Sequence, residues 1–141
     1  MYNLIRYFEW PNYSNSETFV IQIVGNAHTL IKELNENVVS KKTIGGKKIE
    51  LINSDKLDKN KIPHVLYITP EYSAQLKSYA SQLKNKGTLL ITEQEGAAKT
   101  YAVINFVIIE SKQKFEYNQQ NAAKYGLKAS EDIRKLASSV Y

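Results

Sequence analysis

The chain of 141 residues contains no cysteine and no long apolar stretch. Without cysteine it forms no disulfide, and it has no thiol to serve as a nucleophile or a metal ligand. A membrane-spanning helix needs about 20 consecutive apolar residues, and no run in this sequence approaches that length. The composition therefore excludes thiol chemistry and predicts a protein that does not itself span a membrane.

Arginine is also scarce, although the chain is basic. Of 19 lysines and arginines only Arg6 and Arg134 are arginine, and the net charge is +5. Lysine is a poor bidentate reader of phosphates and bases, and nucleic-acid surfaces usually cluster it with arginine and aromatic residues. The lysines here are scattered along the sequence. They indicate a solvated surface, and no nucleic-acid partner is expected.

The sequence lacks the common motifs of catalysis. Its two histidines, His28 and His64, do not form a metal-binding pair at helical spacing. Residues 45–47, Gly-Gly-Lys, lack the earlier glycine and the following Ser or Thr of a phosphate loop. Gly25 stands alone where a dinucleotide loop needs three glycines, and no Gly-x-Ser-x-Gly elbow is present. We therefore expect no cofactor, no metal ion and no enzymatic activity.

What the sequence does contain is the pattern of one α/β domain over residues 1–141. Hydrophobic residues make up 43% and charged residues 23%, ordinary values for a globular protein. Short apolar runs rich in β-branched residues alternate with stretches of helical spacing. The expected strands cover residues 19–24, 49–52, 64–68, 88–92, 102–109 and 114–117. This order predicts a three-layer fold, with a mostly parallel sheet of five to six strands flanked by helices.

Helix signals stand between and after these strands. Residues 2–10 read as a first helix that Pro11 ends, because proline cannot continue a helix. Asn26 and Pro70 begin the next two helices. The last two strands form an antiparallel hairpin followed by two helices. The residues that define these two helices are the caps Asn118 and Ser130, Gly126 in a left-handed conformation between them, and the core-facing Ile133, Leu136, Ala137 and Val140.

Aromatic residues gather in and just after the first expected helix. They are Tyr2, Tyr7, Trp10 and Tyr13. Aromatic side chains with a polar tip are enriched at protein interfaces, so Tyr7 and Trp10 are candidate partner-binding residues. Packing of the same helix on the sheet explains the cluster equally well, and both interpretations stay open.

Polar residues after two expected strands are the other candidates for a binding site. Asn26 and His28 follow the strand at 19–24, and Glu93 and Glu95 follow the strand at 88–92. Open α/β sheets bind ligands at the carboxyl ends of their strands, and two carboxylates can act as an acid and a base. A solvated loop explains the glutamates without any function. A small-ligand sensor domain that uses the loops after Val24, Ile68 and Thr92 remains an alternative function.

Several short patterns along the chain together resemble the YfiR-like family. Those near the carboxyl terminus are Ile104-Asn105-Phe106, Lys112 or Lys114 with Phe115 and Asn118, Ala122-Ala123, Gly126-Leu127-Lys128, Ser130 and Leu136-Ala137. Earlier ones are residues 2–7 with Glu9-Trp10-Pro11, residues 45–49 and residues 64–68. The resemblance spans nearly the whole chain in the right order.

The resemblance implies a periplasmic protein that binds the exterior domain of an inner-membrane diguanylate cyclase. Such a repressor lowers cyclic di-GMP synthesis and so restrains biofilm formation, and an outer-membrane lipoprotein can titrate it away. It also implies a homodimer. Met1 is followed at once by an expected helix, which together with the resemblance predicts that a signal peptide has been removed before Met1.

Overall fold

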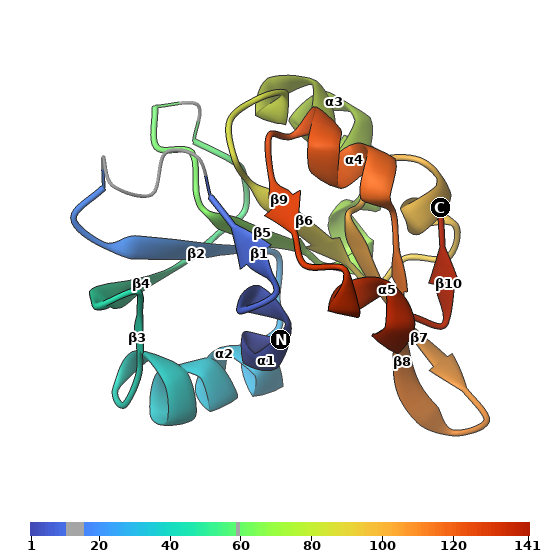
Figure 1. The fold of residues 1–141 in the computed structure, drawn as a ribbon. Coiled ribbons are helices and arrows are strands. Elements are labelled where there is room, and N and C mark those ends of the chain that lie inside the picture. The colour runs from blue at the N-terminus through green and yellow to red at the C-terminus, as the bar shows by residue number, and fades with distance from the viewer. Residues whose placement is uncertain (11–15, 59) are drawn as a thin grey trace.

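The computed structural model describes residues 1–10, 16–58 and 60–141. It shows a mixed α/β fold built on one curled, eight-stranded sheet (Figure 1). The strand order is β10-β8-β7-β6-β5-β2-β4-β3. The strands are β2 (Phe19–Val24), β3 (Thr43–Ile44), β4 (Lys47–Ser54), β5 (Val65–Ile68), β6 (Leu89–Thr92), β7 (Ile104–Ile109), β8 (Lys112–Tyr117) and β10 (Ser139–Val140).

The predicted α/β class and the mostly parallel sheet are confirmed. Strands β4, β2, β5, β6 and β7 run parallel to their neighbours, and β7 and β8 form the expected antiparallel hairpin. The predicted count of five to six strands is too low. The two-residue strands β3 and β10 extend the sheet at its edges, and their signal is too short to read from sequence.

The helices are few and short. They are α1 (Tyr2–Ile5), α2 (His28–Leu34), α3 (Leu76–Leu83), α4 (Gln119–Lys124) and α5 (Asp132–Leu136), with 3-10 turns at Pro70–Gln75 and Ala97–Lys99 and a π turn at Asn35–Val39. From β2 the chain crosses to β4 on one side, and from β5 it crosses to β6 on the other. Right-handed crossovers therefore place α2 and α3 on opposite faces of the sheet, as Figure 1 shows.

The centre of the sheet is fully covered. Every residue of β2, β5 and β6 is buried, as expected for parallel strands with both faces packed. The residues at this centre are fully buried: Phe19, Ile21, Leu66, Leu90 and Ile91. This apolar centre fixes where the polar loops at the strand ends meet.

The predicted first helix over residues 2–10 is wrong beyond its first turn. Helix α1 ends at Ile5, and Phe8–Glu9 instead forms β1, which pairs antiparallel with β9 (Lys128–Ala129). Phe8 is 5% exposed and packs edge-on against the ring of Tyr117. Burial of this ring and pairing with the distant carboxyl-terminal segment override the local helical spacing. Pro11 and Tyr13 lie outside the described residues.

The predicted last helix is also shorter than expected. Helix α5 ends at Leu136, Ala137 is extended, and Val140 lies in β10, which pairs with the end of β8. Ile133 faces the core as predicted, but Leu136 is 53% exposed. The reason is that the chain leaves the helix to add a strand to β8.

Candidate functional site

The carboxyl ends of β2 and β5 form the switch point of the sheet, where chain crossovers leave in opposite directions. Open α/β folds bind ligands in the crevice at such a point. Gly25 ends β2 with a φ of +112°, and a Cβ at this position would lie 1.9 Å from Thr69 Oγ1. Only glycine allows this close approach of the two strand ends. Asn26 and His28 follow directly and are both exposed.

A carboxylate of the chain itself occupies this switch point. The backbone N–H of Asn26 donates to Glu71 Oε1 over 2.7 Å, and the Thr69 hydroxyl donates to the same oxygen over 3.1 Å. An acidic ligand at a switch point would use donors of this kind. Glu71 therefore takes the place of a ligand's acid group. Sequence reasoning missed it because the contact joins residues 45 positions apart.

The two other predicted glutamates lie in a groove at the end of β6. We call this the edge groove. It has a volume of about 540 Å³ and is lined by Glu93, Glu95, Gly96, Lys99, Phe106, Val107, Ile108, Gln113, Glu116 and Tyr141. The groove therefore joins Glu93 and Glu95 with side chains from β7 and β8.

Glu93 also contacts the neighbouring strand. The buried Tyr67 phenol of β5 lies near the Glu93 carboxylate. Burial raises the pKa of Tyr67 above its ordinary value, and the nearby Glu93 carboxylate raises it further. The phenol consequently stays protonated beside the groove.

A buried polar network lies beneath the edge groove. The Asn105 side chain is fully buried, and its Oδ1 accepts from the Thr92 hydroxyl at 2.6 Å and from the Gln94 N–H at 3.0 Å. Its Nδ2 donates to Glu116 Oε1 at 3.0 Å, and the Tyr141 hydroxyl donates to Glu116 Oε2 at 3.3 Å. The network fixes β6, β7, β8 and the carboxyl terminus relative to one another. The signal in the sequence was a lone asparagine in the apolar β7 run.

The aromatic candidates lie away from these strand ends, near the amino terminus. A mostly apolar groove of about 400 Å³ opens there, and we call it the amino-terminal groove. It is lined by Tyr2, Ile5, Arg6, Phe8, Glu9, Trp10, Thr43, Ile44 and Gly45. Trp10 is half-buried and its indole N–H donates to the His64 carbonyl over 2.8 Å. Tyr7 is half-buried outside this lining, with the Arg6 guanidinium 5.4 Å from its ring centroid. The structure thus separates Tyr7 from the groove that Trp10 lines.

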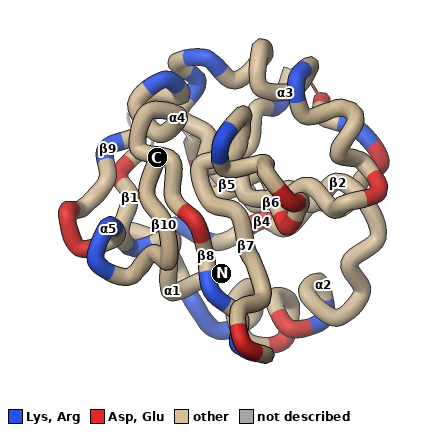
Figure 2. The backbone as a smooth tube through the Cα atoms, turned by 90° about the vertical axis from the view of Figure 1, so that its right-hand side faces the viewer, with Lys and Arg blue, Asp and Glu red and all other residues tan. Residues whose placement is uncertain are grey.

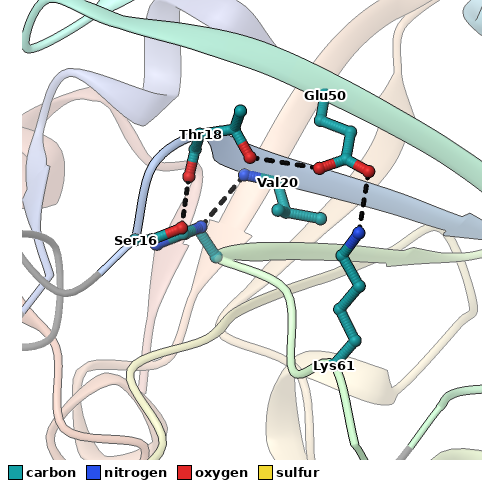
Figure 3. A network of polar contacts seen from close by, with 6 residues as sticks. Ser16, Thr18, Val20, Glu50 and Lys61 are labelled. Atoms are coloured by element: carbon teal, nitrogen blue, oxygen red, sulfur yellow. Dashed lines mark hydrogen bonds and ion pairs between the residues drawn. The ribbon is translucent and has the colours of Figure 1, made fainter.

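A further polar network at the amino end of β2 has a structural role. Figure 3 shows Glu50 of β4 accepting from the Thr18 hydroxyl at 3.1 Å and from Lys61 Nζ at 2.8 Å. The hydrogen bond from Lys61 holds the pKa of Glu50 below its ordinary value. Nearby, the Val20 N–H donates to Nδ1 of the buried His64, which confirms His64 as a structural residue. These contacts join β2 to β4 and to the segment that enters β5.

Charge is not concentrated on one face. In Figure 2 lysine and arginine alternate with aspartate and glutamate around the backbone. Within the described ranges, no group of three or more His, Asp or Glu side chains is placed to hold a metal ion. In the same ranges, no helix has the length and apolarity that crossing a membrane requires.

A sequence model of the YfiR/HmsC-like family matches residues 1–138. The chain belongs to the YfiR/HmsC-like family. A search of curated proteins found no match. Family members are periplasmic, non-catalytic regulators, and membership therefore indicates a role in regulating cyclic di-GMP signalling.

The residues by which this YfiR/HmsC-like chain resembles its family mainly serve the fold. Asn105 is the centre of the buried hydrogen-bond network, and the Trp10 indole N–H donates a hydrogen bond to the main chain next to β5. Asn118 caps α4, its Oδ1 accepting the Asn121 N–H at 2.8 Å, and Gly126 has the predicted left-handed φ of +83°. The pattern therefore identifies the family without marking the surface that meets a partner.

Proposed function

We propose that this YfiR/HmsC-like chain is a periplasmic, non-enzymatic regulator that acts by binding a partner protein. By occupying the exterior domain of an inner-membrane diguanylate cyclase, it represses cyclic di-GMP synthesis and restrains biofilm formation. The observation that carries this proposal is the family match over residues 1–138. The proposal also includes an outer-membrane lipoprotein that competes with the cyclase for the chain. It further includes a homodimer of the chain.

The surface of the molecule supports binding of a macromolecule. The edge groove and the amino-terminal groove are both open at the surface and combine apolar and charged side chains, a mixture typical of protein interfaces. The alternative, a small-ligand sensor, would use the loops after Val24, Ile68 and Thr92, of which the first two meet at the switch point. There Glu71 already accepts the hydrogen bonds that an acidic ligand would need. This arrangement favours the partner-binding function over the sensor.

Deletion of the gene tests the regulatory role directly. We expect cellular cyclic di-GMP and biofilm mass to rise in the deletion strain and to return to normal when the full-length gene is restored. Purified chain should also retain the exterior domain of the cyclase in a pull-down. An unchanged cyclic di-GMP level together with no retention of the cyclase domain would refute the proposal.

Export is tested separately by the reading frame and by fractionation. We expect a signal sequence upstream of the codon for Met1, and the tagged full-length product in the periplasmic fraction. A native start at Met1 with the product in the cytoplasm would contradict export. Neighbouring genes separate the two functions, because a membrane diguanylate cyclase supports the repressor, whereas a histidine kinase or a transporter supports the sensor.

A further inference from the structure

Strand β7 extends beyond its neighbour β6 and exposes an open edge. All six residues of β7 pair with β8, but β6 pairs only with Ile104 and Asn105. Among the described residues, no strand lies on the β6 side of residues 106–109. Figure 1 shows the outer part of the β7–β8 hairpin projecting from the rest of the molecule.

The backbone of this edge faces away from β8. The carbonyls of Phe115 and Tyr117 accept from Ser138 N–H and Tyr141 N–H, and therefore point toward β10. In an antiparallel pair, residues directly opposite each other either both face the partner strand or both face away. Phe106 is opposite Phe115, so Phe106 directs its backbone groups away from β8, and by alternation so does Ile108.

The edge groove lies along this open edge. Pairing of β6 with β7 ends at Thr92 and Asn105, and the groove opens between the segment after Thr92 and the outer part of β7. Glu93, Glu95 and Gly96 line one side of the groove, and Phe106–Ile108 line the other together with Gln113 and Glu116 of β8. The groove therefore borders the open edge of β7 and also extends over the face of the β7–β8 hairpin. Residues 106–109 have no strand partner on this side, and at about 3.3 Å each they make an edge of about 13 Å, which accommodates an added strand of about four residues.

The side chains around the groove indicate the composition of that strand. Ile108 is 70% exposed, an unusual position for a large apolar residue on an open strand edge. Glu93, Glu95 and Glu116 supply three carboxylates, against Lys99, whose ammonium lies 5.8 Å from the Tyr141 ring centroid. Apolar contacts with Ile108 and attraction by the carboxylates favour a segment that alternates apolar and basic residues.

We propose that an extended segment of a partner protein, with apolar residues alternating with Lys or Arg, adds to β7 as a strand in the edge groove. Main-chain hydrogen bonds to Phe106 and Ile108 would provide affinity, and the glutamates would provide selectivity. The inference rests on the proposed function only in assigning the segment to a partner protein.

Synthetic peptides test the site without any partner. The probe is acetyl-Val-Lys-Val-Lys-Val-amide, titrated into the full chain while backbone amide signals are followed by NMR. We expect shifts concentrated at Glu93–Gly96 and Phe106–Ile109. A peptide with Glu in place of Lys should bind at least about tenfold more weakly, and a peptide N-methylated at every residue should not bind, because it has no N–H to pair as a strand. Equal binding of the N-methylated peptide, or no shifts at these amides, would overturn the proposal.

A pair of substitutions at one residue separates strand pairing from side-chain loss. Ile108→Pro removes the N–H that faces the groove, whereas Ile108→Thr keeps it together with a β-branched side chain. We expect Ile108→Pro to abolish peptide binding and Ile108→Thr to reduce it by no more than about threefold. Circular dichroism checks that both fold, and if Ile108→Pro does not, the N-methylated peptide still decides the question.

Three outcomes separate this inference from neighbouring hypotheses. If sedimentation shows that Ile108→Pro dissociates a wild-type dimer, a second copy occupies the groove and the assignment to a partner's strand is wrong. If the peptides fail to bind but the chain retains the cyclase domain, the edge groove is not the binding site and the proposed function stands. If the peptides bind, but deletion leaves cyclic di-GMP unchanged and the cyclase domain is not retained, the site stands and the proposed function fails.

Discussion

The indole N–H of Trp10 donates to the main-chain carbonyl of His64 over 2.8 Å, and so fixes the amino-terminal segment to the entry of β5. The same carbonyl accepts the Leu89 N–H, also at 2.8 Å. The Trp10 ring meets Phe19 edge-on, with ring centroids 4.9 Å apart. Trp10 therefore has a structural role whether or not it also meets a partner.

The Trp10 hydrogen bond should contribute measurably but modestly to stability. In Trp10→Phe the N–H and part of the ring are lost while an aromatic ring remains, and the His64 carbonyl still has the Leu89 N–H as a donor. We expect the free energy of unfolding to fall by about 0.5–1 kcal/mol. Trp10→Ala should cost more, about 2–3 kcal/mol, because it also removes a half-buried ring. Urea denaturation measures both changes, and equal losses would contradict the separate roles of ring and N–H.

Whether Trp10 is also an interface anchor is a second question with its own measurement. If Trp10 contributes to self-association, Trp10→Ala should weaken it by more than ~1 kcal/mol in sedimentation experiments. Tyr7→Ala is the matched variant, because Tyr7 is aromatic and half-buried but does not line the amino-terminal groove. Circular dichroism must show that both variants are folded. Association unchanged by both would exclude this face as the interface.

Local signals in the sequence were enough to predict the central strands and several boundaries. The apolar runs at β2, β5 and β6 were predicted because strands buried on both faces carry few polar residues. Asn118 and Gly126 were predicted because capping and a left-handed φ depend on one residue and its immediate neighbours. In these places, local chemistry and the final fold agree.

The errors occur where distant contacts decide the structure. Residues 2–10 have helical spacing, yet β1 forms because Phe8–Glu9 pairs with a segment about 120 residues away. Leu136 and Val140 fit a helix stripe, but β10 adds to β8 instead. Among the site residues, Glu71 acts through a side-chain contact with a distant backbone N–H, which leaves no pattern in the sequence.

The buried Asn105 network should be sensitive to an isosteric change of charge. Asn105→Asp keeps an acceptor for Thr92 and Gln94, but it replaces the Nδ2 donor with an oxygen facing Glu116 Oε1. We expect a loss of about 1–3 kcal/mol in urea denaturation, from the lost hydrogen bond and the repulsion between the carboxylates. Adding Glu116→Gln supplies a donor and should recover part of the loss. No recovery in the double variant would contradict the proposed pairing.

Stability should decrease on mild acidification because of His64. Burial, with a smaller effect of the Lys47 charge, holds the pKa of His64 below its ordinary value of 6.5, and Nδ1 accepts the Val20 N–H only when unprotonated. The unfolded chain therefore binds a proton at a higher pH than the folded chain does. Stability is complete above about pH 7 and falls as the pH drops from 6.5 toward the folded pKa, by at most about 1.4 kcal/mol per pH unit.

Two variants test whether His64 causes this pH dependence of stability. His64→Asn keeps an acceptor but cannot be protonated, so its unfolding free energy should vary less between pH 7 and pH 5 than that of the wild type. His28→Asn, at an exposed position, should retain the wild-type slope. Guanidinium denaturation at several pH values measures these slopes. A wild-type slope in His64→Asn would show that other groups cause the effect.

Asn118 connects β8 to α4, and substitutions there should destabilise the carboxyl-terminal half more than substitutions elsewhere in it. Its N–H donates to the Val103 carbonyl at 2.8 Å, its Oδ1 accepts the Asn121 N–H at 2.8 Å, and its Nδ2 donates to the Ala98 carbonyl at 2.8 Å. Asn118→Pro removes all three hydrogen bonds. The lost cap alone costs about 0.5–2 kcal/mol, and the two other bonds, made at a buried position, add about 1–3 kcal/mol each.

We therefore expect Asn118→Pro to abolish folding, and Asn118→Asp, which keeps the cap and the backbone N–H, to lower the melting temperature without preventing folding. His28→Ala is the control, because His28 is exposed at the start of α2, and its melting temperature should stay close to that of the wild type. Thermal melting followed by circular dichroism orders the three variants. A larger drop in melting temperature for His28→Ala than for Asn118→Pro would show that the region around α2, rather than the joint between β8 and α4, determines the stability of the domain.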